Sequence, residues 1–589
     1  MTKSRICDNV TFLSLNQSFL MHTIDDLNLK ALKQPHANDN YLCWKKNITS
    51  FSFDYFRPDK TSKPIAMKRI TLLFFVLTVS SQTIAQIKDP VVDAIVKEAS
   101  ENSQLEILAH ELFDKIGARL IGTPQMQQAH DWAVAKYTGW GIDAKNEKWG
   151  EWRGWERGVS HIDMVYPRVK SLEGTQLAWS PSTGGKAVTA EVIIIPDVAD
   201  SVSFQKWLPA VKGKFVLMSM KQPTGRPDYN WEEFGTKESV EKMKADRTAQ
   251  TDAWAARLKK TGYTNRTLPV ALEKAGAAGV VTSNWSRGFG VNKIFDAYTK
   301  KIPTVDVALE DYGLLYRLTE SGTIPRISVL TDSKDKGMVP TFNTIAEIKG
   351  TEKADEYVML SAHFDSWDGG SGATDNGTGT LTMMEAMRIL KKIYPNPKRT
   401  ILVGHWSSEE QGLNGSRAFV EDHPEIIQNL QALFNQDNGT GRVVNISGQG
   451  FLNSYDYISR WLSKVPDKFK DKLETRFPGS PGGGGSDFAS FVAVGAPGFS
   501  LSSNSWLYGS YTWHTNRDTY DKVVFDDVRN NAIVAAILAY AACEDPNRTS
   551  REKSVLPANA KTGEPGKWPE QKKATRKGGV DLTEMPIKK

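Results

Sequence analysis

The chain has 589 residues, of which 40% are hydrophobic and 10% are aromatic; this is enough for a large core and too long for one domain of ordinary size. Its net charge of +6 is concentrated at the two ends, because residues 1–85 and residues 551–589 each carry +5 and residues 86–550 therefore carry −4. The body of the chain has no basic excess, which argues against a nucleic-acid-binding protein.

A short apolar segment with a positive start occupies residues 67–86, MKRITLLFFVLTVSSQTIAQ. Lys68 and Arg69 precede the apolar run, and the small residues Thr83 and Ala85 follow it, which is the pattern of a secretory signal peptide. The run is too short for a typical membrane span. The sequence thus predicts that residues 67–85 are removed and that the protein is exported, to the periplasm or the extracellular space, without stable insertion in a membrane; a buried helix is the alternative.

Residues 1–66 precede this segment, although a signal peptide belongs at the N-terminus. We therefore expect Met67 to be the true start and residues 1–66 to be a non-native extension. The three cysteines, Cys7, Cys43 and Cys543, do not have the spacing of metal ligands. Only Cys543 would remain after cleavage, which leaves no internal disulfide.

The next two segments differ in character. Residues 90–149 have apolar residues at helical spacing in ILAHELFDKIGARL and HDWAVAKYTGWG, with a break at residues 122–124. Residues 161–335 instead contain short strand-like runs, namely AEVIII, GKFVLM, AGVVTS, PTVDVA and RISVL. In this segment, VKGKFVLM and LEKAGAAGVVTSN resemble a protease-associated domain, a small β-rich module often inserted in exopeptidases.

Strands and helices alternate from residue 336 to residue 545. The strand-like runs EYVMLSA, TILVGHW and LQALFNQ are separated by helical stretches, and the segment ends in the helical run NNAIVAAILAYAA. This alternation predicts an α/β sandwich with a mostly parallel central sheet flanked by helices. Residues 546–589 are rich in Lys, Pro and Gly, and we expect a basic, mobile tail there.

Charged side chains follow three of the predicted strands. His363 and Asp365 come directly after the first, Glu409 and Glu410 after the second, and Asp437 after the third. Sites in open α/β sheets assemble at the carboxyl ends of the strands. We therefore expect these side chains to meet in space.

Two further residues extend this set. Asp375 lies in the loop HFDSWDGGSGATDNGTGT, which begins at His363, and His514 lies in YTWHTNRDT. Two His, two Asp and one Glu suit two zinc ions, and converging carboxylates would repel each other without a cation. The glycines let the backbone bring Asp375 close to His363.

Each feature has a simpler interpretation when taken alone. His363 could be a polar surface residue that follows a strand. A Glu-Glu pair such as Glu409-Glu410 suits the start of a helix, and Asp375 could be a helix cap. Their common placement at strand ends favours a metal site.

The motifs HFDSWDGGSGATDNGTG, WSSEEQGLNGS, NQDNGTG, GSDFASF and WHTNRDT together resemble the co-catalytic zinc exopeptidases of the aminopeptidase and glutamate carboxypeptidase family. The resemblance covers residues 90 to 540 approximately. It implies a peptidase domain made of residues 86–160 and 336–545, with residues 161–335 as a protease-associated insert.

The resemblance also implies roles for the residues. Asp375 would bridge two zinc ions, His363 and Asp437 would bind one of them, and Glu410 and His514 the other. Glu409 would be the general base that deprotonates a bridging water, and Asp365 would orient a ligand histidine. The expected substrates are small peptides. Residues expected to line their pocket are Ser486, Asp487 and Tyr508.

Other functions remain open at this level. A dizinc deacylase or amidohydrolase acting on N-acyl groups or non-peptide amides would use the same ligands. A non-catalytic binding protein should have lost Glu409 or a ligand, and a two-metal phosphoesterase should have a basic phosphate clamp that the motifs lack. The direction of cleavage, from the amino or the carboxyl end, and the oligomeric state, a homodimer included, are also open.

Overall fold

The computed structural model describes residues 89–579. The predicted extension (residues 1–66) and signal peptide (residues 67–85) lie outside the described residues. Among the residues that are described, none of the helices combines the length and apolar character needed to cross a membrane.

The centre of the peptidase region is a mostly parallel sheet, which confirms the predicted fold class. Strand β9 is flanked by β10 and β11, and β14 follows β11, all in parallel. Every residue of β10 and β11 is buried, as expected for strands covered on both faces. The strands are β9 (Lys353–His363), β10 (Arg399–Trp406), β11 (Leu430–Asn435), β12 (Val443–Ser447), β13 (Glu474–Arg476) and β14 (Gly498–Ser503).

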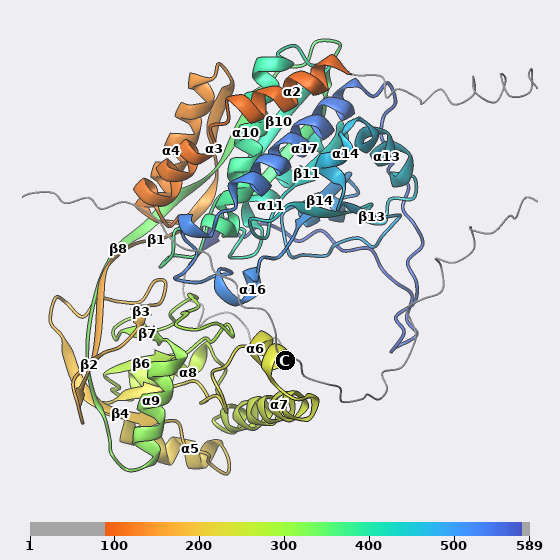
Figure 1. Cartoon of the computed structure of the whole chain (residues 1–589). Helices are drawn as coiled ribbons and strands as arrows, with labels where there is room; N and C mark the ends of the chain where they lie inside the picture. The colour runs from red at the N-terminus through yellow and green to blue at the C-terminus, as the bar shows by residue number, and fades with distance from the viewer. Residues whose placement is uncertain (1–88, 580–589) are drawn as a thin grey trace, which may run out of the picture. The chain divides into compact units, whose positions relative to one another are not determined.

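Two long helices cover these strands. Helices α10 (Thr378–Ile393) and α17 (Phe525–Glu544) lie side by side and pack on β9 (Figure 1). Nearly all of α17 is buried, which explains its continuous apolar sequence. The other helices of this region are α11 (Asn414–Asp422), α12 (Pro424–Gln428), α13 (Ser454–Lys464), α14 (Asp467–Lys470), α15 (Phe488–Ala493) and α16 (Tyr508–Tyr511).

The N-terminal part is helical up to Gly139 rather than up to residue 149. Its elements are α2 (Pro90–Glu101), α3 (Leu105–Ala109), the π-helix η1 (His110–Ile116) and α4 (Pro124–Gly139). The predicted break at residues 122–124 starts α4, whose first turn is capped by the Thr123 hydroxyl. From Asp143 the chain becomes strand β1 (Asp143–Tyr166) because it pairs with β8 (Arg326–Ile348), a long-range interaction that helical periodicity cannot reveal.

Strands β1 and β8 form a long antiparallel ribbon, and both predicted boundaries of the insert fall within it. The five predicted strand-like runs form β4, β5, β6, β7 and the start of β8. Strands β4, β5, β6 and β7 are parallel. Residues 161–335 contain two apolar clusters of their own, and a further cluster joins Ala178, Trp179 and Ile294 to Trp367 and Ala418 of the peptidase region. Its strands are β2 (Lys170–Ser171), β3 (Gly174–Gln176), β4 (Val188–Ile194), β5 (Phe215–Leu217), β6 (Gly279–Thr282) and β7 (Thr304–Val307).

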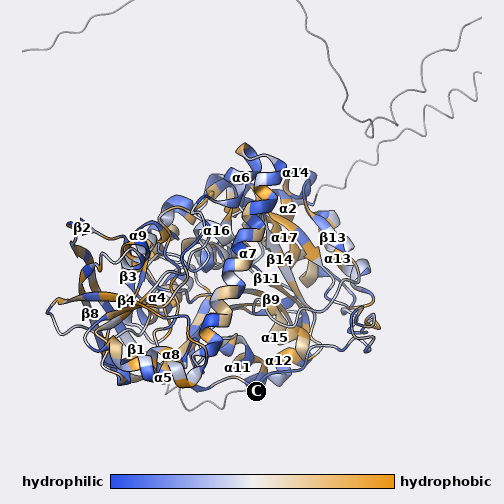
Figure 2. Ribbon diagram, turned by 90° about the horizontal axis from the view of Figure 1, so that it is seen from below, coloured by the Kyte–Doolittle hydropathy of each residue, from blue (hydrophilic) through white to orange (hydrophobic). Residues whose placement is uncertain are grey.

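The insert is more helical than the sequence indicates. Helix α7 has 24 residues, yet only Met243 and Arg247 are buried, and it is drawn largely in hydrophilic and pale colours in Figure 2. Because it has no apolar stripe, its sequence lacks the usual helical signal. The helices are α5 (Ser201–Trp207), α6 (Asp228–Phe234), α7 (Lys237–Lys260), α8 (Thr267–Lys274) and α9 (Leu309–Glu320).

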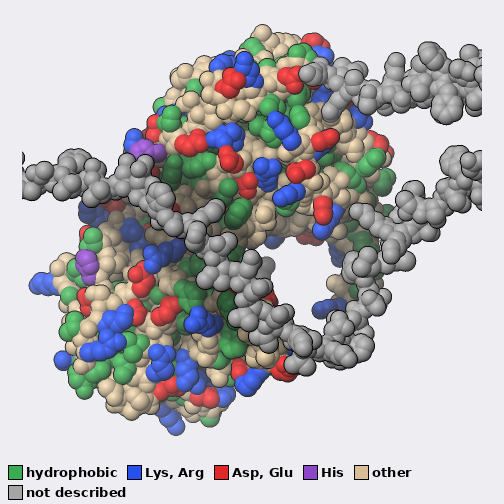
Figure 3. All heavy atoms as spheres, viewed as in Figure 1, with side chains coloured by type: hydrophobic (Ala, Val, Ile, Leu, Met, Phe, Trp, Pro, Cys, Tyr) green, Lys and Arg blue, Asp and Glu red, His purple; other side chains and the backbone are tan. Residues whose placement is uncertain are grey.

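The predicted mobile tail is attached to the body as far as residue 579. Arg576 forms ion pairs with Glu421 and Asp422 at 2.8 Å, the Trp568 ring packs on Phe451, and β15 (Lys577–Gly578) pairs with β1. These contacts depend on partners remote in sequence, which the composition of the segment does not reveal. On the face shown in Figure 3, basic and acidic side chains are interspersed.

Arg388 of α10 joins α2 to the core and provides a test of the fold. Its side chain is 9% exposed and lies 2.6 Å from Glu98 and 2.9 Å from Glu385. Arg388→Met leaves the buried Glu385 without a cation and Glu98 with only the exposed Lys392, so we expect the free energy of unfolding to fall by about 3–5 kcal/mol. Lys392 pairs with the same Glu98 but is 56% exposed, and Lys392→Met should cost less than about 1 kcal/mol. Urea denaturation measures the loss of stability in both variants. Equal losses would contradict the larger contribution that we assign to the buried Arg388.

Candidate metal centre

The predicted site residues gather at one edge of the sheet. His363 is the last residue of β9, Glu409 and Glu410 follow β10 by three and four residues, and Asp437 follows β11 by two. Because the three strands are parallel neighbours, their carboxyl ends meet at the same edge.

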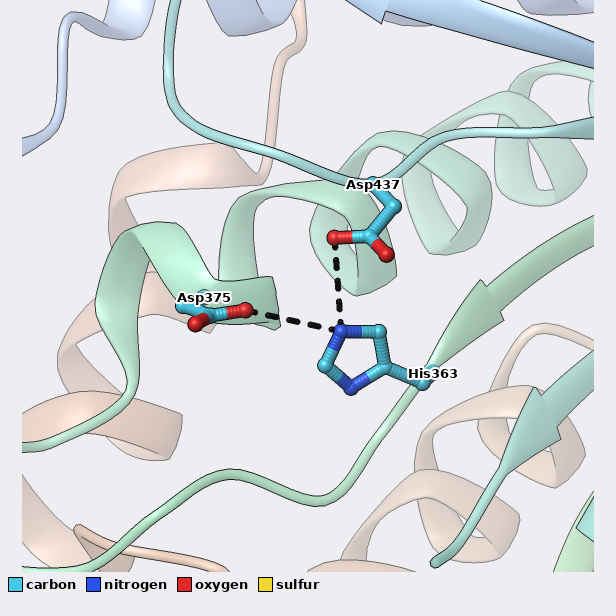
Figure 4. A group of neighbouring side chains, drawn as sticks. All are labelled: His363, Asp375 and Asp437. Atoms are coloured by element: carbon cyan, nitrogen blue, oxygen red, sulfur yellow. Dashed lines mark ion pairs between the residues drawn. The ribbon is translucent and has the colours of Figure 1, made fainter. Parts of the chain in front are cut away.

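Two groups of ligand atoms share one carboxylate. In the first group, His363 Nε2 lies 3.6 Å from Asp375 Oδ1 and 3.4 Å from Asp437 Oδ1 (Figure 4). In the second, His514 Nε2 lies 3.5 Å from Asp375 Oδ2 and 2.8 Å from Glu410 Oε2. The structure therefore brings all five sequence-predicted ligands together, with one oxygen of Asp375 facing each group.

The donor atoms fit a metal better than they fit a hydrogen-bond network. Asp375 Oδ2, the oxygen that faces the second group, and Glu410 Oε1, beside the ligand oxygen of that carboxylate, are buried and have no hydrogen-bond partner in the described part of the chain. Leaving such atoms unsatisfied costs about 1–3 kcal/mol each, and carboxylate oxygen and imidazole nitrogen are ligands that zinc accepts.

The centre is crowded with negative charge. Burial raises the pKa of Glu410 well above its usual value, and the neighbouring Asp375 raises it further. Burial alone would lower the pKa of His363, but the carboxylates of Asp437 and Glu409 outweigh it and raise the pKa well above its usual value. A cluster of this kind takes up protons, and a divalent cation that binds there displaces them. The affinity of the cluster for metal therefore rises with pH.

A buried arginine shapes the loop that carries Asp375. Arg119 is fully buried and donates hydrogen bonds to the backbone carbonyls of Gly117, Phe364, Ser371 and Gly372. Gly372 has a φ of +59°, and a Cβ there would lie 2.3 Å from the Cβ of Ser366. The loop therefore needs glycine at this position.

Asp518 fixes the backbone of the shared ligand. Its carboxylate accepts hydrogen bonds from the N–H groups of Thr374 at 2.8 Å and Asp375 at 2.9 Å. Burial raises the pKa of Asp518 to about 7, and the charge of Asp375 acts in the same direction. The sequence reasoning missed Asp518 and Arg119, although both lie in motifs quoted above, because their contacts are with backbone atoms remote in sequence.

Asp365 and Asp368 have different partners. The Asp365 carboxylate accepts hydrogen bonds from the N–H groups of Glu409 and Glu410, and the Nδ1 atom of His363 lies 3.0 Å from the Asp365 carbonyl oxygen and 3.6 Å from its carboxylate. Asp365 therefore orients both the histidine and the Glu409-Glu410 turn. Asp368 is held by Arg157 at 2.6 and 2.9 Å and belongs to neither ligand group.

The three predicted substrate residues differ in how deeply they are buried. Ser486 is 3% exposed and accepts a hydrogen bond from Asn435, and Asp487 is 0% exposed; that they line the substrate pocket stays a prediction. Burial raises the pKa of Asp487 to about 7. Tyr508, at the start of α16, is half-buried, and its hydroxyl is placed to donate to Asp375.

Comparison with known proteins places this centre in a family. Residues 343–539, which contain all five ligand candidates, match the sequence pattern of Peptidase family M28. The chain carries a Peptidase family M28 domain. Carboxypeptidase Q of Rattus norvegicus is 25% identical over 433 residues, covering 74% of this chain and 84% of the rat protein. Carboxypeptidase Q of Homo sapiens is 25% identical over 481 residues, covering 79% and 93%.

A solved structure has the same fold. A Peptidase M28 precursor from Shewanella amazonensis aligns with 80% of this chain and 99% of its own, with a TM-score of 0.58 at 23% identity. At this identity the likeness shows the fold alone. The M28 domain and the carboxypeptidase Q relatives indicate a metallo-exopeptidase, as the motifs predict.

The different partners of the loop carboxylates predict different effects on metal content. Asp437→Asn removes a ligand of the first group, and we expect the purified protein to lose bound metal on dialysis. Asp368→Asn is the matched control: its side chain is held by Arg157, so the metal content should equal that of the parent. Elemental analysis measures both. Equal loss in the two variants would contradict the ligand assignment.

Proposed function

We propose that this chain is an exported exopeptidase that holds two zinc ions and hydrolyses the terminal peptide bonds of dipeptides and other small peptides. One observation carries the proposal: Asp375 presents one oxygen to each of two ligand groups, the arrangement that two adjacent metal ions require. The carboxypeptidase Q relatives support removal of terminal residues.

The residues divide into those that hold metal and one that moves a proton. His363 and Asp437 would hold one zinc, Glu410 and His514 the other, and Asp375 both. Zinc, when bound, supplies an activated water and polarises the scissile carbonyl. Glu409 belongs to neither ligand group, and burial raises the pKa of its carboxyl well above the usual value. It would accept a proton from the attacking water and donate it to the amine as the C–N bond breaks.

The neighbours Glu409 and Glu410 should respond differently to the same substitution. Glu409→Gln removes the basic oxygen but no metal ligand, so we expect full zinc content and a rate lower by about 10²–10⁴-fold. Glu410→Gln weakens one ligand group, so we expect lost zinc and partial recovery of activity in excess zinc. Elemental analysis and a zinc titration of the hydrolysis rate distinguish the two. Full activity of Glu409→Gln would reject it as the base.

The substrate class is tested with end-blocked compounds. We expect the zinc-loaded protein to hydrolyse free dipeptides. The test compounds are a dipeptide, its N-acetyl form, its C-terminal amide and an N-acyl amino acid. Liquid chromatography measures the hydrolysis of each. Hydrolysis of the N-acyl amino acid alone would replace the exopeptidase by a deacylase. Loss of activity on the N-acetyl form or on the amide identifies which end of the peptide is recognised.

Export is supported by the predicted signal peptide, which lies outside the described residues. We expect mass spectrometry of the exported protein to find Gln86 as its first residue, after cleavage behind Ala85. A mature protein that still begins at Met1 would contradict the export signal.

A further inference from the structure

One segment of the insert reaches the metal centre. Lys293 pairs with Thr515 in an antiparallel bridge, the Ile294 N–H donates to the carbonyl of His514 at 2.8 Å, and the Asn516 N–H donates to the carbonyl of Asn292 at 3.0 Å. The backbone around Lys293 is therefore fixed to the loop that supplies the ligand His514.

The insert holds this segment from its other side. Asn292 is fully buried, and its side-chain amide donates to the backbone carbonyl and the carboxylate of Asp306, both at 3.1 Å. Asp306 belongs to β7 and also accepts hydrogen bonds from Thr282 and from the Asn284 N–H. The position of Lys293 is thus determined by the core of the insert as well as by the peptidase region.

The side chain of Lys293 is a half-buried cation without a carboxylate partner. Its Nζ lies 3.8 Å from the centre of the Trp513 ring, and no acidic oxygen forms an ion pair with it within residues 89–579. Its charge nevertheless acts on Asp375 and on His514. An ammonium group has three N–H donors, and contact with the face of one ring leaves donors available.

We propose that Lys293 binds the C-terminal carboxylate of the substrate and so selects peptides whose free carboxyl end lies next to the scissile bond. This inference rests on the proposed peptidase function. Metal ions would neutralise the carboxylates of the centre, which leaves the charge of Lys293, beside the loop of the ligand His514, without a balancing carboxylate. A free carboxylate complements it through charge-assisted hydrogen bonds, whereas the ammonium end of a peptide would be repelled.

The test compares leucyl-leucine with leucyl-leucinamide on the zinc-loaded full chain. Lys293→Met keeps most of the side-chain stem over Trp513 and removes the charge; Lys293→Arg keeps the charge. Lys301 is an exposed lysine of the same insert, and Lys301→Met is the control. We expect the parent to prefer the free acid, and Lys293→Met to lose about 10- to 150-fold of this preference, mainly through a higher KM. Lys293→Arg should retain most of it.

A structural role for Lys293 gives a different result. If Lys293→Met slows hydrolysis of the acid and the amide equally, or if the parent does not distinguish them, the proposal is overturned. Calorimetry measures the binding of the same two compounds to Glu409→Gln, with and without Lys293→Met. This measurement tests carboxylate binding by Lys293 independently of the peptidase activity. If the parent hydrolyses neither compound, the peptidase proposal fails, and the binding preference for the acid still decides the role of Lys293.

Discussion

Repulsion among buried carboxylates is the constraint on which this structure depends. Asp375, Glu410 and Asp437 converge on two imidazoles in a space with almost no exposed surface, an arrangement that loses solvation without gaining a counter-ion. Protons or metal ions must supply the missing positive charge. The surrounding scaffold keeps the carboxylates in place until a cation binds.

The scaffold achieves this by fixing backbone rather than by pairing the carboxylates. Parallel strands present His363 and Asp437 from neighbouring positions, Arg119 and Asp518 hold the loop around Asp375 through its carbonyl and N–H groups, and Asp365 holds the turn of Glu409. Ligand oxygens thereby remain free for metal. His514 itself, Asn438 next to the ligand Asp437, and Ser408 next to Glu409 have positive φ, a conformation that costs energy and clusters at functional sites.

The insert contributes to the same centre. Its backbone pairs with the loop of His514 through residues 292–294. In the proposed function, the peptidase region would supply the ligands and the proton-transfer group, and the insert would supply Lys293 for recognition of the substrate.

The sequence by itself determined the parallel sheet, because buried strands are continuous apolar runs. It also indicated the five ligand candidates: His363, Glu410 and Asp437 follow these strands, and Asp375 and His514 lie in motifs that resemble those of zinc exopeptidases. It did not determine β1, the exposed helix α7 or the attachment of residues 546–579, since these depend on pairing with remote partners such as β8 and Glu421. Tertiary structure alone placed Arg119, Asp518 and Lys293 next to the centre. Their roles follow from contacts across hundreds of residues, which no local pattern encodes.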